Sequence, residues 1–466
     1  METRDKNSIR KLAYSILLSG IFLVSSCEDF IDVGTPQTQL TGETVFEDSA
    51  TADAAMANIY SKLQTDVLVT GGPNGLSVLM GAYADELVSY SNYGLPDERF
   101  FTNNVLPDDA AVLALWSDSY NLVYAANAVM EGVSNSLSLP QADKNRLLGE
   151  ALFVRSYIYS YLTGLYGSIP YATITDYTVN TALSKKTTSE INQLLITDLQ
   201  QAVTLLPSEY VSANRVRPNK ETAMALLARI ALNEGLYDLA IQTSGNVIGQ
   251  TSLYSLASDL DTVFLIDSPG TLWQLAPAAE ALNTLEGESF IFETTPPHTR
   301  ALANELYNAF EQGDLRKELW IGTVSDGGTS YYYANKYKLM LPTGTSQEYS
   351  IQFRLEELYL IRAEAFAKTG GLSQALADLD TIRSRAGLQG STAQSQEALL
   401  EAILHERRVE FFTEHGHRFF DLKRYNAATS ALEPLKPGWN PTDVLLPLPQ
   451  NELNVNGNLL PQNIGY

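Results

Sequence analysis

The sequence predicts a mostly α-helical protein that contains about four tetratricopeptide-like helical pairs. Apolar residues recur at spacings of three and four in several long segments, which is the period of a helix face that is buried. Residues 353–388 and 219–249 share a second pattern, since each carries two alanines twelve residues apart, Ala363 with Ala375 and Ala228 with Ala240. A tetratricopeptide unit has small residues where its helices cross, and one unit cannot bury its own apolar face, so several should stack. An irregular all-α domain would fit the same spacings.

The predicted pairs follow one another along the chain. Gly370 and Gly371 end the first helix of the last pair, as glycine commonly does. Pro207 ends the second helix of an earlier pair, whose two helices are separated by an insertion at 168–188. The four pairs are expected at residues 51–64 with 111–133, 149–167 with 189–207, 219–249, and 353–388.

The first 26 residues predict a secretory signal peptide. A basic start is followed by a 13-residue apolar run, Leu12–Val24, which is too short to span a bilayer core of about 30 Å. Val24-Ser25-Ser26-Cys27 resembles a bacterial lipobox, in which the cysteine is diacylated on sulfur. Cys27 is the only cysteine, so the chain cannot form an internal disulfide. We therefore expect a lipid-anchored tether at residues 27–45, the alternative being that Cys27 is a buried thiol.

The formal net charge is −23, and no basic run offsets it. Such a surface repels polyanions at long range, which argues against nucleic acid as a partner. Neutral glycans and peptides both remain compatible with this charge.

Two regions depart from the helical pattern. Residues 66–110 combine turn residues with aromatic side chains that have no helix face to serve. These side chains form either a small satellite core or a stacking platform for a ligand, with Asn92, Asp97 or Asn103 as hydrogen-bonding groups. The ligand candidates here are Tyr90, Asn92, Tyr93, Phe100 and Phe101.

Residues 251–350 form the second irregular region. A Gly-Gly turn before a tyrosine run predicts a hairpin, in which Tyr331 and Tyr333 share one face and Tyr332 lies on the other. The secondary ligand candidates are Trp273, Trp320, Tyr331 and Tyr333.

Common catalytic motifs are missing from the sequence. It contains no Gly-x-Ser-x-Gly elbow, no phosphate-binding loop and no GxGxxG turn. His405, His415 and His417 cluster, but their spacing does not match a zinc site. We expect no metal, no cofactor and no enzymatic activity. An all-α glycoside hydrolase, with two carboxylates about 5 to 9.5 Å apart, and a purely protein-binding repeat scaffold are the alternatives.

The C-terminal part carries four motifs that together resemble the SusD/RagB family of outer-membrane lipoproteins. They are Glu406-Arg407-Arg408, Gly416–Arg424, Pro447–Leu453 and the final Gln462–Tyr466. The resemblance implies a SusD-like fold, a location on the outer membrane, and a SusC-type TonB-dependent transporter as partner. It also implies non-catalytic capture of an oligosaccharide or peptide on a loop face away from the repeats. The implied layout is an N-terminal helical region at 46–250, a ligand-face insertion at 251–350 and a C-terminal region at 351–466.

The charged residues of these motifs are interleaved with apolar ones, so their helix is apolar on more than one side. Buried charges persist only when they are paired. We therefore expect structural ion pairs in which Arg407, Arg408 or Arg418 contacts Glu406, Glu410 or Asp421.

Overall fold

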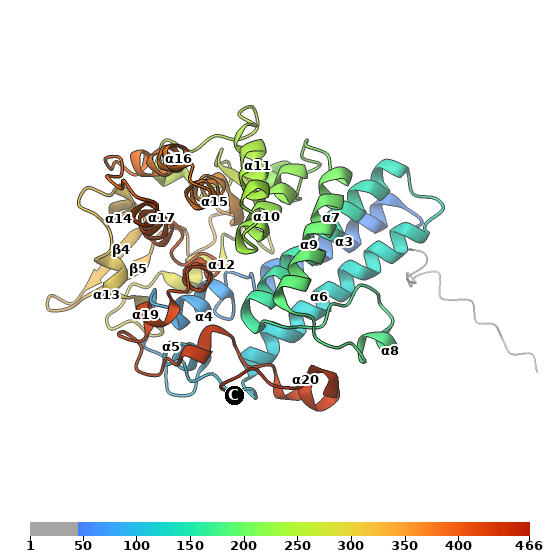
Figure 1. The fold of residues 1–466 in the computed structure, drawn as a ribbon, viewed down its shortest axis with the longest axis horizontal. Coiled ribbons are helices and arrows are strands. Elements are labelled where there is room, and N and C mark those ends of the chain that lie inside the picture. The colour runs from blue at the N-terminus through green and yellow to red at the C-terminus, as the bar shows by residue number, and fades with distance from the viewer. Residues whose placement is uncertain (1–44) are drawn as a thin grey trace, which may run out of the picture. The chain divides into compact units, whose positions relative to one another are not determined.

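The helices of the chain stack in sequence order. The computed structural model describes residues 45–466; the predicted signal peptide, Cys27 and the tether up to residue 44 lie outside the described residues. Residues 46–466 form a single unit, which is drawn in Figure 1. No helix in this described part has the length and apolar character needed to cross a membrane.

Each segment predicted to be helical contains a helix, which confirms the mostly α-helical fold class. Successive members of the stack pack on one another, and α17 covers α15 and α16. The long helices are α3 (Ser49–Thr65), α6 (Ala110–Asn135), α7 (Gln141–Tyr166), α9 (Thr188–Leu205), α10 (Lys220–Asn233), α11 (Tyr237–Ile248), α15 (Leu355–Lys368), α16 (Leu372–Arg385) and α17 (Gln396–Glu410).

Local sequence signals set the ends of these helices. Thr187 and Glu190 form a reciprocal capping box at the start of α9. Gly370 follows α15 with φ of 85°, a conformation that glycine adopts without strain. The alanines at the predicted crossings, Ala363 and Ala375, are fully buried.

Residues 66–110 contain two short helices that the sequence pattern did not predict, α4 (Leu76–Tyr83) and α5 (Pro96–Phe101). All eight residues of α4 are buried. A helix that is buried on all sides has no polar face, so it shows no apolar period. The expectation that this region lacks helix was therefore wrong.

The strands form two small antiparallel sheets. One has the order β1-β3-β5-β4 and the other pairs β2 with β6. The predicted hairpin is confirmed as β4 and β5, whereas Phe353, expected in a helix, lies in β6. The strands are β1 (Leu87–Ser89), β2 (Thr271–Leu275), β3 (Arg300–Leu302), β4 (Ile321–Ser325), β5 (Ser330–Ala334) and β6 (Ser350–Arg354).

Short helices complete the unit. Helices α8 and α20 lie at the lower right of Figure 1, away from the β4-β5 hairpin at the left. The short α-helices are α8 (Tyr177–Asn180), α12 (Leu285–Phe290), α13 (Asn304–Tyr307), α14 (Leu315–Leu319), α18 (His417–Arg424), α19 (Ala428–Leu432) and α20 (Gln450–Val455). The 3-10 turns are η2 (Ala213–Arg215), η3 (Leu260–Thr262), η4 (Pro441–Val444) and η5 (Gly457–Leu459).

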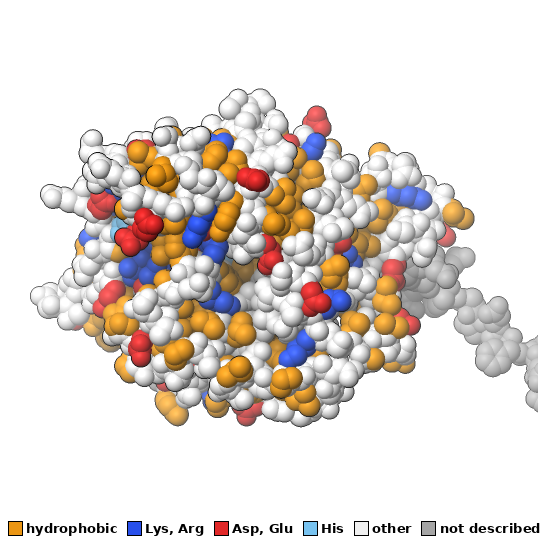
Figure 2. All heavy atoms as spheres, in the orientation of Figure 1, with side chains coloured by type: hydrophobic (Ala, Val, Ile, Leu, Met, Phe, Trp, Pro, Cys, Tyr) orange, Lys and Arg blue, Asp and Glu red, His pale blue; other side chains and the backbone are white. Residues whose placement is uncertain are grey.

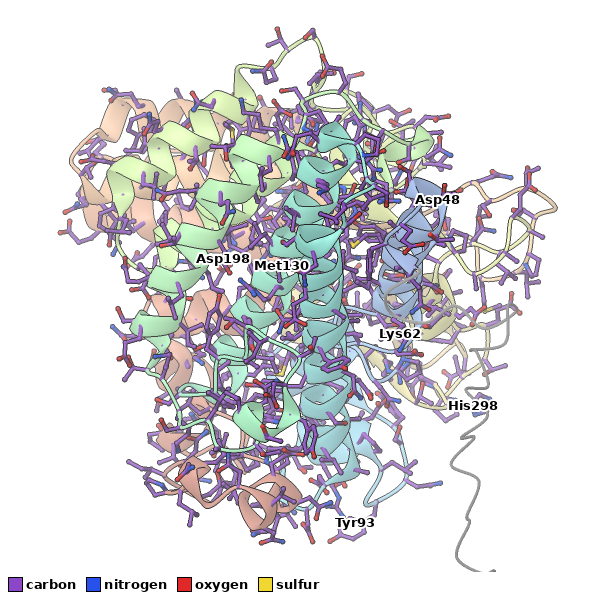
Figure 3. All side chains as sticks on the ribbon, turned by 90° about the vertical axis from the view of Figure 1, so that its right-hand side faces the viewer. Asp48, Lys62, Tyr93, Met130, Asp198 and His298 are labelled. Atoms are coloured by element: carbon purple, nitrogen blue, oxygen red, sulfur yellow. The ribbon has the colours of Figure 1, made fainter. Side chains whose placement is uncertain are left out.

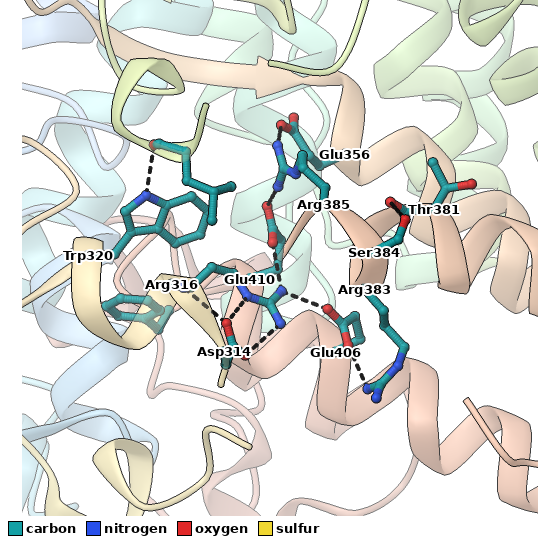
Figure 4. Close-up of polar contacts among 12 residues, drawn as sticks. Asp314, Arg316, Trp320, Glu356, Thr381, Arg383, Ser384, Arg385, Glu406 and Glu410 are labelled. Carbon is teal, nitrogen blue, oxygen red and sulfur yellow. Dashed lines mark hydrogen bonds and ion pairs between the residues drawn. The ribbon is translucent and has the colours of Figure 1, made fainter. Parts of the chain in front are cut away.

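A network of buried charges joins the insertion to the C-terminal helices (Figure 4). The guanidinium of Arg316, on α14, is fully buried and donates to Glu406 at 2.6 Å and to Glu410 at 2.8 Å. It also contacts Asp314 through Nε and Nη2. Glu410 in turn accepts from Arg354 and Arg385, each at 2.5 Å. Burial alone would raise the pKa of Glu410, but these arginines hold it well below its ordinary value.

The charged residues of the family motifs also lie in ion pairs. Arg407 donates to Asp421 at 2.7 Å, which is one of the expected combinations. Arg408 and Arg418 instead contact Asp85, each at 2.8 Å. The partner of these two arginines is thus supplied by the segment after α4, more than three hundred residues earlier.

Replacing Arg316 by methionine should lower the free energy of unfolding by roughly 3–5 kcal/mol, because it leaves Glu406 and Glu410 buried without this partner. Chemical denaturation measures the change. Lys338→Met is the matched control: it removes the exposed pair with Asp261 and should cost about 1 kcal/mol or less. Equal effects of the two substitutions would contradict a structural role for the Arg316 network.

A second prediction concerns Glu286, which is buried on α12 and accepts a hydrogen bond from Ser350. Burial raises the pKa of Glu286 to about 7, above its ordinary value of 4.5. The stabilising contribution of this raised pKa is complete below pH 4.5 and is lost as the pH rises through about 7. Glu286→Gln should therefore gain stability relative to the parent protein between pH 5 and pH 8, by an amount on the order of 2 kcal/mol.

Unfolding curves of the parent protein and the Glu286→Gln variant at pH 5 and at pH 8 test this expected gain in stability. Glu288→Gln, an exposed position on the same helix, serves as the control. A difference between Glu286→Gln and the parent that does not change with pH would show that Glu286 is charged at both values.

Candidate functional site

The four-stranded sheet brings the two irregular regions together. Strand β1, from the first region, pairs with β3 of the second so that Ser89 lies opposite Arg300. The pairing continues past the strand, since the Tyr90 amide donates to the Thr299 carbonyl at 2.7 Å. Strand β3 then pairs with β5, with Leu302 opposite Tyr332. Aromatic residues more than two hundred positions apart thus share one surface.

Alternation along the strands places Tyr90, Tyr331 and Tyr333 on one face. The rings of Tyr90 and Tyr331 meet edge to face with their centroids 5.7 Å apart. Tyr333 contacts Phe292 in the same way, at 5.3 Å. A Cβ at Gly322 would lie 2.0 Å from the Tyr333 ring, so only glycine leaves room for that ring across β4. These four aromatic residues, Tyr90, Phe292, Tyr331 and Tyr333, are called the sheet aromatics below.

Tyr332 points to the opposite face, as the sequence predicted. It stacks on Tyr307 with a centroid distance of 3.7 Å and an interplanar angle of 9°. The Lys317 ammonium lies 3.9 Å from the centroid of the Tyr307 ring.

The loop after β1 is the most exposed part of the site. Tyr90 is 40% exposed and Tyr93 is 89% exposed, and Asn92 between them is also exposed. Figure 3 shows Tyr93 at the edge of the molecule, below the start of α6. A cavity of about 270 Å³ lies beside Gly94, between α5 and the first residues of α6.

A buried ion pair supports this loop. Arg300, on β3, donates through Nε and Nη2 to Asp97 at 3.0 and 2.6 Å. The same guanidinium donates to the Ser289 carbonyl. Asp97 is therefore bound to Arg300, and Asn103 is buried with its amide donating to the Tyr83 carbonyl. Of the three polar residues expected to face a ligand, only Asn92 is exposed.

Two predicted ligand residues of the first irregular region pack into the protein. Phe100 is fully buried against Tyr83. Phe101 is half-buried and lies under the Lys436 ammonium, 4.2 Å from its ring centroid. Phe100 thus belongs to the satellite core that the sequence analysis gave as the alternative.

Trp273 and Trp320 correct the expectation made for them, because both side chains are fully buried. The Trp273 indole donates to the Val216 carbonyl and packs among Tyr60, Phe153 and Phe353. The Trp320 indole donates to the Leu260 carbonyl and packs on Phe264. Neither ring offers a face to a ligand.

Sequence reasoning missed Phe292 and Tyr307. Both lie outside the tyrosine run and outside any periodic segment. Their contacts with Tyr333 and Tyr332 depend on strand pairing, for which the residues themselves carry no local signal.

The arrangement offers flat apolar surface with polar groups at its edge. Tyrosine rings combine an apolar face with a hydroxyl, and such surfaces suit sugar rings and apolar peptide side chains alike. Within residues 45–466, no group of three or more His, Cys, Asp or Glu residues is arranged to hold a metal ion. Figure 2 shows that acidic side chains are scattered over the face of the molecule that is turned toward the viewer and are not gathered in one place.

Comparison with known proteins identifies the family. A profile described as "SusD family" matches residues 303–440, and a second, "Starch-binding associating with outer membrane", matches residues 29–232. The chain belongs to the SusD/RagB family. The SusD-like protein P2 of Formosa agariphila is 27% identical to it over 98% of this chain and 99% of the relative. The SusD-like protein P25 of the same organism is 24% identical over 96% and 98%.

Solved SusD structures share the fold. A SusD superfamily protein from Bacteroides vulgatus superposes with a TM-score of 0.80 at 20% identity, covering 91% of this chain and all of that one. A structure named "Laminarin binding SusD-like protein" gives 0.76 at 22% identity, over 90% and 100%. Surface glycan-binding protein A from Bacteroides thetaiotaomicron, in complex with laminarihexaose, gives 0.75 at 19% identity, over 89% and 99%.

Proposed function

We propose that this SusD/RagB protein is a non-catalytic binding protein that captures a neutral oligosaccharide on the sheet aromatics. The single observation that carries the proposal is the convergence of Tyr90 and Tyr331, from two distant loops, on one partly exposed surface. Two solved structures of similar fold support carbohydrate rather than peptide, one named for laminarin and one holding laminarihexaose.

The surface chemistry favours a neutral ligand. A net charge of −23 disfavours sulfated or uronate-rich glycans at long range. Sugar hydroxyls need only hydrogen-bond partners, and Asn92 and the tyrosine hydroxyls supply these at the edge of the site. An uncharged oligosaccharide therefore loses nothing to repulsion and gains stacking contacts.

The proposed role is binding without bond cleavage. Glycoside hydrolysis needs two carboxylates, one to protonate the leaving group and one to act as base or nucleophile. Asp97 is held by two hydrogen bonds from Arg300 and is 7% exposed, so it is not free for either task. An assay for released reducing ends tests the hydrolase alternative directly.

We further propose that the chain is lipid-anchored at Cys27 on the outer membrane, faces the exterior, and passes its ligand to a SusC-type TonB-dependent transporter. The motifs at Val24–Cys27 and the family description "associating with outer membrane" support the location. A rigid scaffold with its ligand surface on loops suits a protein that must present cargo to a channel.

Substituting Tyr90 or Tyr331 by alanine should weaken binding of laminarihexaose or another neutral oligosaccharide by about tenfold, which is ~1.4 kcal/mol. Each substitution removes one stacking ring from the sheet aromatics. Isothermal titration calorimetry of the soluble chain beginning at Glu28 gives the affinity. Tyr332→Ala is the matched control. Tyr332 lies on the same strand as Tyr331, but its side chain stacks on Tyr307 on the other side of the sheet.

Unchanged affinity in both the Tyr90 and the Tyr331 variant would exclude the sheet aromatics as the site. Tight binding of peptides with no binding of any neutral glycan would show that the ligand is a peptide and not an oligosaccharide. Thermal unfolding of each variant shows whether a loss of binding comes from loss of structure.

Replacing Cys27 by serine should release the protein from membranes, because the acylated sulfur is the proposed anchor. Fractionation of cells, with mass spectrometry of the N-terminal peptide, measures both location and acylation. Thr38→Ala, within the tether, is the control and should stay in the membrane fraction. Membrane retention of Cys27→Ser would show that another feature holds the protein there.

A further inference from the structure

A second cavity lies on another side of the helical unit from the sheet aromatics. It has a volume of about 350 Å³, within the size range of small-molecule binding sites. One side is α6, the second is the segment 170–183 that contains α8, and the third is residues 452–459 of the C-terminal part. Figure 1 shows α8 and α20 on the opposite side of the view from the β4-β5 hairpin. We call this cavity the α6 groove.

Hydrogen bonds hold the two outer walls in place. Asn456 and Asn458 each donate a side-chain amide at 2.9 Å to a carbonyl of the facing wall, at Leu183 and Ala182. On the other side, the Tyr120 hydroxyl donates to the Pro170 carbonyl at 2.7 Å and ties that wall to α6. The α6 groove is therefore formed without a ligand, which lowers the entropic cost of binding.

Aromatic and apolar side chains line the opening. Tyr124 is 53% exposed and Tyr177 is 75% exposed, and both line the groove from different walls. Val455 is also largely exposed, and Figure 2 shows hydrophobic side chains at the surface where α20 lies. Trp116 lies deeper and is nearly buried, with its ring against Tyr120.

The polar groups of the groove are uncharged amides and hydroxyls together with the carboxyl group of Glu452. Asn180 lines the cavity, and its side-chain amide donates to the Ile174 carbonyl at 2.7 Å. Glu452 lines the same cavity, and burial raises the pKa of its carboxyl. None of the described residues that line the groove is a lysine, arginine or histidine. The lining therefore suits a ligand that both donates and accepts hydrogen bonds, and an anion would find no compensating cation among the described residues that line the groove.

We propose that the α6 groove is a second binding site for a neutral carbohydrate, which takes a short oligosaccharide segment between Tyr124 and Tyr177. Sugar hydroxyls both donate and accept hydrogen bonds, which suits the amide, hydroxyl and carboxyl groups of the lining, and the apolar face of a sugar ring matches the exposed tyrosine rings. This inference rests on the proposed carbohydrate function but concerns different residues. Two sites on one chain would let a long polysaccharide bind more tightly than a short oligosaccharide.

Trp116 supplies a local probe, because it lines the α6 groove and the chain has only four tryptophans. The soluble chain from Glu28 is labelled with 5-fluorotryptophan, and the Trp116 resonance is assigned with the Trp116→Phe variant. Laminarihexaose and maltohexaose are titrated in and followed by fluorine NMR. We expect the Trp116 resonance to shift saturably, while the resonances of the buried Trp273 and Trp320 stay unchanged.

Variants separate the two sites. The double substitution Tyr124→Ala/Tyr177→Ala should weaken the Trp116 response at least tenfold, and Tyr90→Ala/Tyr331→Ala should leave it intact. Tyr237→Ala, on α11, is the matched control for removal of a partly exposed tyrosine. Thermal unfolding confirms that each variant is folded.

The outcomes distinguish this inference from the proposed function. If calorimetry detects binding that depends on Tyr90 and Tyr331 while Trp116 does not respond, the groove inference fails and the proposed function stands. If Trp116 responds and the Tyr90/Tyr331 variant keeps its full affinity, the inference of a binding site in the α6 groove is supported and the sheet aromatics are excluded as a binding site. A response of Trp116 to peptides alone overturns the carbohydrate assignment of the groove, and no response to any glycan at either site overturns both.

Discussion

The structure depends on the neutralisation of charge that is buried between the insertion and the C-terminal helices. Glu410 accepts hydrogen bonds from Arg316, Arg354 and Arg385, which come from three different elements of the chain. A charged group in the protein interior is costly unless partners surround it, so these elements are stable only in each other's presence. Helix α17, which carries Glu406 and Glu410, is therefore the point where the insertion and the repeat helices meet (Figure 4).

The same constraint positions Tyr331 and Tyr333, the two sheet aromatics that lie on the β4-β5 hairpin. The β4-β5 hairpin follows Arg316 and precedes Lys336, and both cations are buried against the C-terminal segment. The Lys336 ammonium donates to the Glu414 carboxylate at 2.5 Å and to the carbonyls of Glu410 and Phe412. Buried ion pairs of Arg316 and Lys336 thus hold both ends of the hairpin in place. The tyrosines between these two residues are held in place with it. An exposed strand pair alone would have no such support.

The helical part of the fold could be predicted because its apolar residues carry a period that any helix with one buried face must show. Helix α4 lacked that period, since every side chain in it is buried. The prediction that Trp273 and Trp320 bind a ligand failed for a related reason. Both lie in sequence without a helical period, yet strand pairs and turns bury their side chains in the core. The contact of Tyr90 with Tyr331 and the pairing of Arg418 with Asp85 join residues more than two hundred positions apart. No local pattern specifies such contacts, so only the folded chain shows them.

The tyrosines of the candidate site differ in how much order a ligand must impose on them. Tyr331 is held in a strand and touches Tyr90, whereas Tyr93 is 89% exposed and is followed by Gly94 with φ of 84°. Immobilising an exposed side chain on binding costs about 0.5–1.5 kcal/mol, which offsets much of what one stacked ring contributes. Tyr90 and Tyr331 avoid most of this cost because the sheet already orders them. The affinity of the site should therefore come from the paired rings above the sheet, with Tyr93 adding contact area at its edge.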